Sequence, residues 1–455
     1  MDTGSHRPKL PPGFVWGVST SSYQIEGATR EDGRGASIWD TYCRQPGHIA
    51  NGDTGDVACD HYHRYLEDVG LMRDLGIDSY RFSVAWPRVM PAGRGAVNEA
   101  GLAFYDRLID ALIAEKIEPW LCLYHWDLPQ ALEDLGGWTN RDSAQWFADY
   151  ASVIASRYGD RVKRFATFNE PSVFTLFGYC LGGSAPGLSD HSLLLRTIHH
   201  VNLAHGAAIE RLRAIVRDAS LGAIHNCQPC RPGGSDPNDG LASNKLDAYW
   251  NGAFPDPQIL GRYPPLLADA VAPYQHPDDL ARICRPIDWF GLNHYSPHYV
   301  VAASGKPLGI GFASAPANVP RSSMGWPVEP KAFRDTLVDK YRRYGRPIYV
   351  LENGTAAPDE VDASGKVSDQ SRIEYLRSYT AAMSDAIKAG ADVRGYFIWS
   401  LLDNFEWGSG YSQRFGLVYV DYRTQRRIPK ASFHWYSQLI KRSRESHPSV
   451  KSPAA

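Results

Sequence analysis

The sequence lacks any apolar run near the roughly 20 residues that a membrane helix needs. Residues 1–10 are polar and broken by proline, without the apolar core of a secretory signal, so we expect a cytoplasmic protein with no membrane partner. The chain also has no large excess of positive or negative charge, since 48 basic and 50 acidic side chains give a formal net charge of -2. Without a basic face to collect phosphates, we expect no nucleic-acid partner.

Cysteine is scarce, and its seven copies, an odd number scattered along 455 residues, indicate reduced thiols rather than a disulfide framework. Cys227 and Cys230 form a single Cys-x-x-Cys pair without a second pair, so a zinc or redox role is the less favoured alternative. His61 and His63, near Cys59, invite a metal interpretation, but residues two apart in a helical pattern do not share a face. We therefore expect no metal and no other cofactor.

Short apolar runs alternate with helical patterns over most of the chain. The runs predict eight strands, at 14–19, 80–84, 119–124, 165–168, 221–225, 289–293, 348–351 and 395–399. Helical spacing predicts helices at 60–76, 98–116, 140–157, 191–216, 330–343 and 371–389, with weaker patterns at 242–250 and 278–283. Glycines 345 and 390 are the expected C-caps of two of these helices.

Eight such alternations favour an α/β fold, a single-domain (β/α)₈ TIM barrel with loop insertions at the C-terminal face of the strands. An open dinucleotide-binding sheet is not supported, because no Gly-x-Gly-x-x-Gly follows the first strand. We expect the barrel at 13–441, an N-terminal extension at 1–12 and a C-terminal tail at 442–455. Residues 302–328, rich in Gly, Ser, Ala and Pro, predict an irregular insertion over the mouth of the barrel.

Two of the predicted strands end on a glutamate. The run at 165–168 is followed by Asn169, Glu170 and Pro171, and the run at 348–351 by Glu352. We expect Glu170 to be extended, because a following proline disfavours the α region. Since barrel enzymes place their catalytic residues at the carboxyl ends of strands, both acids should reach one face, and paired carboxylates are what glycoside hydrolysis requires. Either glutamate alone could equally be an ordinary surface residue.

Amides, acids and aromatic rings recur near the other strand ends. Paired donors and acceptors suit sugar hydroxyls, and aromatic planes pack against the C–H face of a pyranose, so this inventory indicates a neutral sugar. The candidates are Gln24, Arg81, His125, Trp126, Asn169, Glu170, Asn293, Tyr295, Glu352, Trp399, Glu406 and Trp407.

From Phe14 to about Tyr436 the sequence resembles the family 1 glycoside hydrolases, the β-glucosidase family. The resemblance rests on ordered motifs at 14–17, 22–27, 80–88, 125–129, 167–171, 293–295, 351–354 and 399–407. The departures are mild: Leu351 stands where threonine is usual, Thr355 where alanine is common and Phe405 where tryptophan is frequent.

The resemblance implies a retaining exo-acting β-glycosidase that removes terminal non-reducing β-D-glucosyl residues by a two-step double displacement. It implies that Glu170 is the acid/base and Glu352 the nucleophile, flanked by Arg81 and Tyr295. The terminal sugar would be held by Gln24, His125, Trp126, Asn169, Glu406 and Trp407, with Trp399 beneath it and Asn293 nearby. Family members that act on 6-phosphorylated sugars carry serine and lysine where Glu406 lies, so we expect no phospho-β-glucosidase.

Two other classes remain as alternatives. A barrel metallohydrolase would need a histidine cluster at strand ends, where only His125, His225 and His294 qualify. A sugar-binding protein of this fold without activity would normally have lost one of the two glutamates. The leaving-group side is expected to consist of loops at 180–191, 227–240 and 302–328, and their composition does not identify the leaving group. The choice among glucose, galactose and fucose also stays open.

Overall fold

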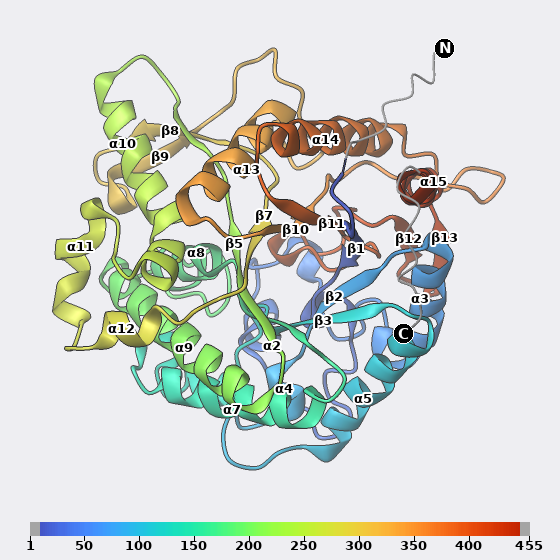
Figure 1. The fold of residues 1–455 in the computed structure, drawn as a ribbon, viewed down its shortest axis with the longest axis horizontal. Helices are drawn as coiled ribbons and strands as arrows, with labels where there is room; N and C mark the ends of the chain where they lie inside the picture. The colour runs from blue at the N-terminus through green and yellow to red at the C-terminus, as the bar shows by residue number, and fades with distance from the viewer. Residues whose placement is uncertain (1–9, 446–455) are drawn as a thin grey trace, which may run out of the picture.

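The structure is a computed structural model, and it describes residues 10–445. Eight parallel strands close into a barrel at the centre of the molecule, with helices around it (Figure 1). Around the barrel the order is β1-β11-β10-β7-β5-β4-β3-β2. The strands are β1 (Val15–Ser19), β2 (Ser79–Ser83), β3 (Glu118–Tyr124), β4 (Arg164–Asn169), β5 (Ser220–Asn226), β7 (Trp289–Asn293), β10 (Ile348–Asn353) and β11 (Val393–Trp399). The predicted barrel is confirmed, with strand ends shifted by a residue or two.

A helical segment follows each barrel strand. The long helices are α3 (His61–Leu75), α5 (Glu99–Ala114), α7 (Ser143–Tyr158), α9 (Leu194–Ile215), α13 (Pro330–Tyr344), α14 (Gln370–Lys388) and α15 (Ala431–Glu445). After β5 come α10 (Pro237–Asp247), α11 (Pro265–Val271) and α12 (Asp279–Ile283). Short helices lie in the loops: α1 (Ser22–Ile25), α2 (Ile38–Cys43), α4 (Trp86–Val89), α6 (Gln130–Glu133) and α8 (Pro171–Thr175).

Three predicted boundaries need comment. The helix predicted at 242–250 begins at Pro237, because the Asp236 side chain caps its first turn and accepts a hydrogen bond from the Asn238 amide. The insertion at 302–328 is less irregular than predicted, since β8 (His298–Ala302) and β9 (Ile310–Ala313) pair as an antiparallel hairpin there. Helix α15 runs to Glu445, past the expected start of the tail at 442. Residues 1–9 and 446–455, which hold most of the two expected terminal segments, lie outside the described part.

Alternation along the strands divides the core in two. In β3, Trp120 and Cys122 belong to a small cluster with Trp289, Tyr349 and Phe397, whereas their neighbours Leu121 and Leu123 belong to the large core shared with the helices. Because successive side chains of a strand point to opposite sides, the small cluster fills the inside of the barrel. These aromatic rings need room: a Cβ atom on Gly222 would lie 2.4 Å from the Trp289 ring.

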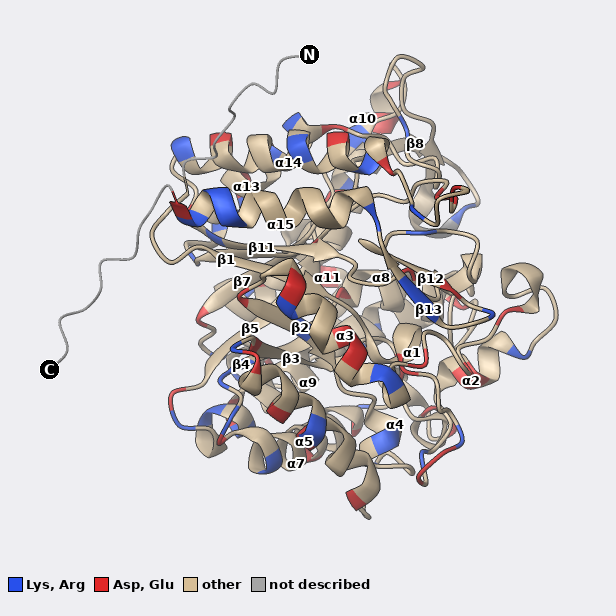
Figure 2. Ribbon diagram, turned by 90° about the vertical axis from the view of Figure 1, so that its right-hand side faces the viewer, with Lys and Arg blue, Asp and Glu red and all other residues tan. Residues whose placement is uncertain are grey.

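The surface and the thiols agree with the composition. Basic and acidic residues are interspersed along the ribbon (Figure 2). None of the helices in the described part combines the length and the apolar composition that crossing a bilayer requires. All seven cysteines are free thiols, as the odd count predicted.

A short sheet of β6 (Cys230–Pro232), β8 and β9, and a hairpin of β12 (Val418–Asp421) and β13 (Arg426–Pro429), complete the fold.

Candidate active site

Glu352 lies near the end of β10, where the pairing with β7 shifts register between Val350 and Glu352. Such bulges are frequent next to active sites, because they re-aim a side chain. Arg81 Nη1, from β2, donates to Glu352 Oε1 at 2.6 Å, and the Tyr295 hydroxyl donates to Oε2 at 2.6 Å. Burial raises the pKa of Glu352, while the Arg81 cation and these hydrogen bonds act in the opposite direction. Both carboxylate oxygens of Glu352 therefore accept a hydrogen bond that stabilises its ionised form.

Glu170 joins β4 to α8, and its backbone corrects the prediction of an extended residue. Its φ of 50° and ψ of 60° are in the left-handed region. Proline at 171 disfavours the right-handed α region, and the chain turns at once from strand to helix, which is consistent with the left-handed conformation of Glu170. Two hydrogen bonds hold this turn: the Glu170 amide donates to Ile224 O at 2.8 Å, and the Val173 amide donates to Glu170 O at 3.0 Å.

The Glu170 side chain faces two amides and a second acid. Asn226 Nδ2 and Asn293 Nδ2 each donate to Glu170 Oε1 at 2.8 Å. Burial and the charge of Glu352 together raise the pKa of Glu170 to about 8. Burial is the larger cause. One carboxyl group is thus suited to carry a proton at neutral pH, while the other is held by a guanidinium.

Both glutamates line a single cavity of about 630 Å³ at the C-terminal face of the barrel. Of the other predicted residues, six share its wall: His125, Trp126, Tyr295, Trp399, Glu406 and Trp407. The rings are close to one another, with Trp126 and Trp407 stacked at a centroid distance of 4.6 Å and His125 stacked on Trp399 at 5.7 Å. Trp399 Nε1 donates to Glu406 Oε1 at 3.2 Å. Hydrogen-bonding groups and aromatic planes therefore occupy the same pocket.

Two tryptophans of this wall have unusual backbones. Trp126 has a φ of 78° and Trp407 a φ of 51°. A bulky residue with positive φ is rare, and such conformations cluster at functional sites, where the surrounding structure must hold them. The Trp126 indole donates to the backbone oxygen of Asn169 at 2.9 Å, which is one such restraint.

Behind the wall, Asn169 connects the two halves of the site. Arg81 Nη2 donates to Asn169 Oδ1, and Asn293 Nδ2 donates to the same oxygen at 3.0 Å. Asn169 Nδ2 lies 3.2 Å from His125 Nε2. Burial and the neighbouring Arg81 cation hold the pKa of His125 well below its usual value, so this imidazole is neutral.

Gln24 is placed differently from the other predicted sugar ligands. It is completely buried, and its amide nitrogen donates to Asn404 Oδ1 at 2.9 Å and to Phe405 O at 2.8 Å. Its amide oxygen accepts from the Ser21 hydroxyl at 2.6 Å. In this structure the Gln24 side chain therefore braces the loop that leads to Glu406.

Several residues of this cavity were not among those predicted from the sequence. Asn226 ends β5 and could have been found by the same rule that identified the other strand ends, but the Trp250 indole, which donates to Asn226 Oδ1 at 3.1 Å, carries no such signal. The outer wall is largely apolar and includes Val173, Phe177, Phe312, Met324, Trp326 and Phe415. Each of the three loops expected on the leaving-group side, at 180–191, 227–240 and 302–328, contributes residues to it.

The sites considered as metal alternatives have other partners. Among residues 10–445, no group of three or more His, Cys, Asp or Glu side chains is arranged to hold a metal ion. His61 Nδ1 lies 2.7 Å from Asp68 Oδ2, and His63 is paired with Asp60. Cys227 is completely buried, and burial raises the pKa of its thiol to about 12.

Known proteins match this chain along almost its whole length. The sequence profile of Glycosyl hydrolase family 1 matches residues 6–445. The chain is 44% identical to Beta-glucosidase A of Thermotoga maritima over 95% of its own length and 98% of that protein. It is 44% identical to a 1,4-beta-D-glucan glucohydrolase of Thermotoga neapolitana, again over 95% and 98%. The solved structure of a family 1 β-glucosidase from Thermotoga maritima superposes with a TM-score of 0.92 at 43% identity, covering 96% of this chain and 99% of that one. The chain therefore belongs to glycosyl hydrolase family 1.

Proposed function

We propose that the chain is a retaining β-glucosidase that acts from the non-reducing end and releases β-D-glucosyl residues from aryl, alkyl or oligosaccharide glucosides. One observation carries the proposal: a carboxylate bonded by Arg81 and Tyr295 shares a cavity with Glu170, whose pKa is raised to about 8. We assign Glu352 as nucleophile and Glu170 as acid/base. The names of the relatives from both Thermotoga species support the same activity.

In the first step Glu170 gives its proton to the glycosidic oxygen while Glu352 attacks the anomeric carbon. The leaving oxygen gains the proton, and the bond from carbon to that oxygen breaks as the bond to Glu352 forms. Direct attack requires the two carboxyl groups to be about 5–5.5 Å apart, too close for an intervening water molecule. The bonds from Arg81 and Tyr295 keep Glu352 anionic until it reacts.

In the second step Glu170 reverses its role. Glu170 is a carboxylate after the first step. Once the sugar is bonded to Glu352, the negative charge that helped to raise the pKa of Glu170 is gone, so Glu170 stays ionised and can activate water as a base. Water attacks the anomeric carbon, Glu170 takes its proton, and Glu352 leaves as a carboxylate. Two inversions at one carbon leave the product with the configuration of the substrate.

We assign sugar recognition to His125, Trp126, Asn169, Trp399, Glu406 and Trp407, with supporting roles for Gln24 and Asn293. A hydrogen bond from Asn169 to the 2-hydroxyl would strengthen in the oxocarbenium-like transition state. Glu406 would accept hydrogen bonds from the 4- and 6-hydroxyls of the sugar. Burial raises the pKa of Glu406 to about 8, and this carboxyl, ionised or protonated, provides no counter-charge for a 6-phosphate. We therefore propose selectivity for unphosphorylated sugars, and a location in the cytoplasm, which the seven free thiols support.

The test is the configuration of the first-formed sugar, followed by proton NMR with nitrophenyl β-D-glucoside as substrate. The double displacement releases β-glucose, which later equilibrates. Initial release of α-glucose would contradict the mechanism, and a wild-type protein that binds glucose but releases no nitrophenol would favour the sugar-binding alternative. Glu352→Ala should abolish release. Undiminished turnover after chelator treatment is expected, and its loss would favour a metallohydrolase.

A further inference from the structure

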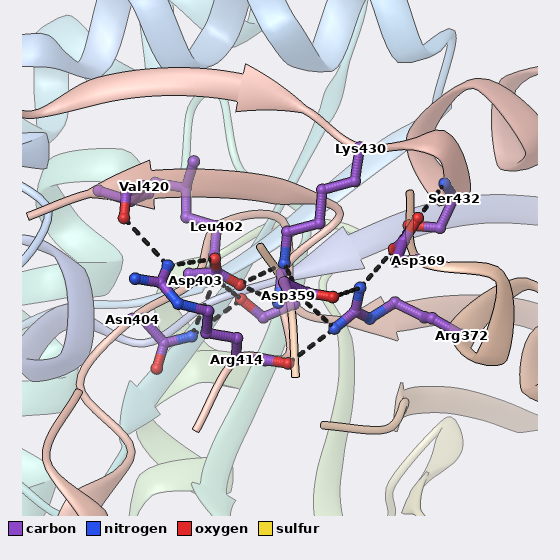
Figure 3. Close-up of polar contacts among 12 residues, drawn as sticks. Asp359, Asp369, Arg372, Leu402, Asp403, Asn404, Arg414, Val420, Lys430 and Ser432 are labelled. Carbon is purple, nitrogen blue, oxygen red and sulfur yellow. Dashed lines mark hydrogen bonds and ion pairs between the residues drawn. The ribbon is translucent and has the colours of Figure 1, made fainter. Parts of the chain in front are cut away.

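A buried network of charges connects the segments that follow β10 and β11. Figure 3 shows its polar contacts. The network contains three carboxylates and three cations: Asp359, Asp369, Asp403, Arg372, Arg414 and Lys430. Five of the six side chains are at most 1% exposed, and that of Arg414 is 17% exposed. Buried charges of this kind are tolerated only when they are paired, and here the numbers of positive and negative groups are equal.

Lys430 is the link between two loops of the active site. Its ammonium donates to Asp403 Oδ1 at 2.6 Å and to Asp359 Oδ2 at 2.5 Å. Asp359 belongs to the loop that follows Glu352 at the end of β10, and Asp403 to the loop that follows Trp399 at the end of β11. In Figure 3 the Lys430 side chain reaches between the two aspartates. One cation therefore joins the segment behind the nucleophile to the segment that leads to Glu406.

Two arginines connect the same two segments, Arg372 through backbone oxygens and Arg414 through the Asp403 carboxylate. Arg372 Nε donates to Thr355 O at 3.3 Å and Nη2 to Arg414 O at 2.7 Å, and the two terminal nitrogens, Nη1 and Nη2, also donate to Asp359. Arg414 Nη1 donates to Asp403 Oδ2 at 2.7 Å. The next residue, Phe415, lines the cavity and packs edge-on against Tyr295. The network is thus in contact with the backbone of the cavity wall.

Backbone hydrogen bonds hold Asp403, Phe405 and Glu406 in place. The Asp403 amide donates to Val418 O at 2.9 Å, the Phe405 amide to Gln24 O at 3.2 Å, and the Glu406 amide to Gly410 O at 2.8 Å. A displacement of Asp403 would therefore be passed along a short, bonded segment to Glu406. Because this segment is short, Glu406 would have little conformational freedom to return to its original position.

We infer that Lys430 is a positioning residue for sugar recognition: by bridging Asp359 and Asp403 it holds Glu406 in register with Glu352. Lys430 itself is completely buried and acts through the two loops. The inference rests on the proposed function, in which Glu406 accepts the 4- and 6-hydroxyls of the sugar. A substrate without the 6-hydroxymethyl group should depend less on this register than a glucoside.

Lys430→Met tests the inference by removing the charge at nearly constant length. Asp359→Asn, which is isosteric and keeps the Lys430 contact with Asp403, serves if the first variant folds poorly. Arg141→Met is the matched control, because it breaks an ion pair between the turn before α7 and a buried carboxylate, Asp279, the first residue of α12. The measurement is kcat/KM for nitrophenyl β-glucoside divided by kcat/KM for nitrophenyl β-xyloside, a pentoside that lacks the 6-hydroxymethyl group.

This ratio separates positioning from folding, since partial unfolding lowers both rates equally. We expect the ratio to fall about tenfold in Lys430→Met, and in the same direction in Asp359→Asn, because displacements near 1 Å can cost up to about 100-fold. The ratio should not change in Arg141→Met. Unchanged ratios in both network variants would overturn the inference while wild-type glucosidase activity stands. A wild-type protein that hydrolyses neither glycoside would instead overturn the proposed function.

Discussion

Arg81 Nη1 lies 2.6 Å from Glu352 Oε1, although the two residues are 271 positions apart in the chain. Their side chains are 1% and 4% exposed, so the pair is shielded from solvent. The second nitrogen of the same guanidinium bonds Asn169, the neighbour of Glu170. Arg81 therefore joins the two strands that carry the glutamates, and the pairing exists only because β2, β4 and β10 meet inside one barrel.

Tyr295→Phe should shift the acidic limb of the pH profile. The hydroxyl hydrogen bond lowers the pKa of Glu352, so its loss raises that pKa, and a higher pH is needed to ionise the nucleophile. We expect kcat/KM to fall by about 10-fold to 100-fold at neutral pH, and less at higher pH. The check is the pH dependence of kcat/KM in both proteins. A uniform loss at every pH would contradict this role of the hydroxyl.

Glu170 should determine the alkaline limb. With a pKa raised to about 8, its proton is present below that pH and lost above it, so kcat/KM of the wild-type protein should fall as pH rises through about 8. Glu170→Gln should lose activity on alkyl glucosides by about 10²-fold to 10⁴-fold, and the alkaline limb should disappear. A substrate with nitrophenol, which leaves without much protonation, should be affected less in its first step. A wild-type profile flat from about pH 4 to 9 would contradict the paired-carboxylate account.

The same residue should cost the protein stability at neutral pH. The pKa of Glu170 is raised from 4.5 to about 8 on folding, so the protonated form is favoured in the folded state. Below about pH 4.5 the carboxyl is protonated in both states, and the shift has no effect on the free energy of unfolding. As pH rises from there toward 8, the unfolded state ionises first, and the free energy of unfolding falls. Glutamine does not titrate and can still accept from Asn226 and Asn293. Relative to wild type, Glu170→Gln should therefore gain unfolding free energy between these pH values, on the order of a few kcal/mol at pH 8. Denaturant unfolding at pH 5 and pH 8 measures the difference, and an equal effect at both would be inconsistent with it.

Glu406→Ser tests the recognition of the unphosphorylated sugar. Removing the carboxyl should lower kcat/KM for nitrophenyl β-glucoside by about 10²-fold, since one or two hydrogen bonds to hydroxyls are lost. The loss for the matching 6-phosphoglucoside should be much smaller, so the preference between the two substrates should narrow. Leu66→Ser, on an exposed face of α3, is a suitable control for handling and folding. An unchanged preference would show that another group excludes the phosphate.

Local sequence patterns were enough to predict the eight strands, most of the helices and the two glutamates at strand ends. These features are local: a burial pattern with a period of two or 3.6 is carried by a few neighbouring residues, and the barrel rule converts a strand end into a position on one face. The motifs were sufficient for family membership as well. The start of α10 is a local feature as well, because Asp236 and Pro237 form its N-cap and first helical position, although the predicted range began at 242.

Which side chains contact one another depends on the three-dimensional fold. The left-handed Glu170 follows from the path of the chain between β4 and α8, the raised pKa of Glu170 from burial beside Glu352, and the bracing role of Gln24 from the position of Phe405. Lys430 reaches Asp359 across 71 positions of sequence and showed no pattern of its own. Such contacts depend on how the barrel closes and how its loops pack. The residues next to a side chain in the sequence do not reveal which distant residues folding brings into contact with it.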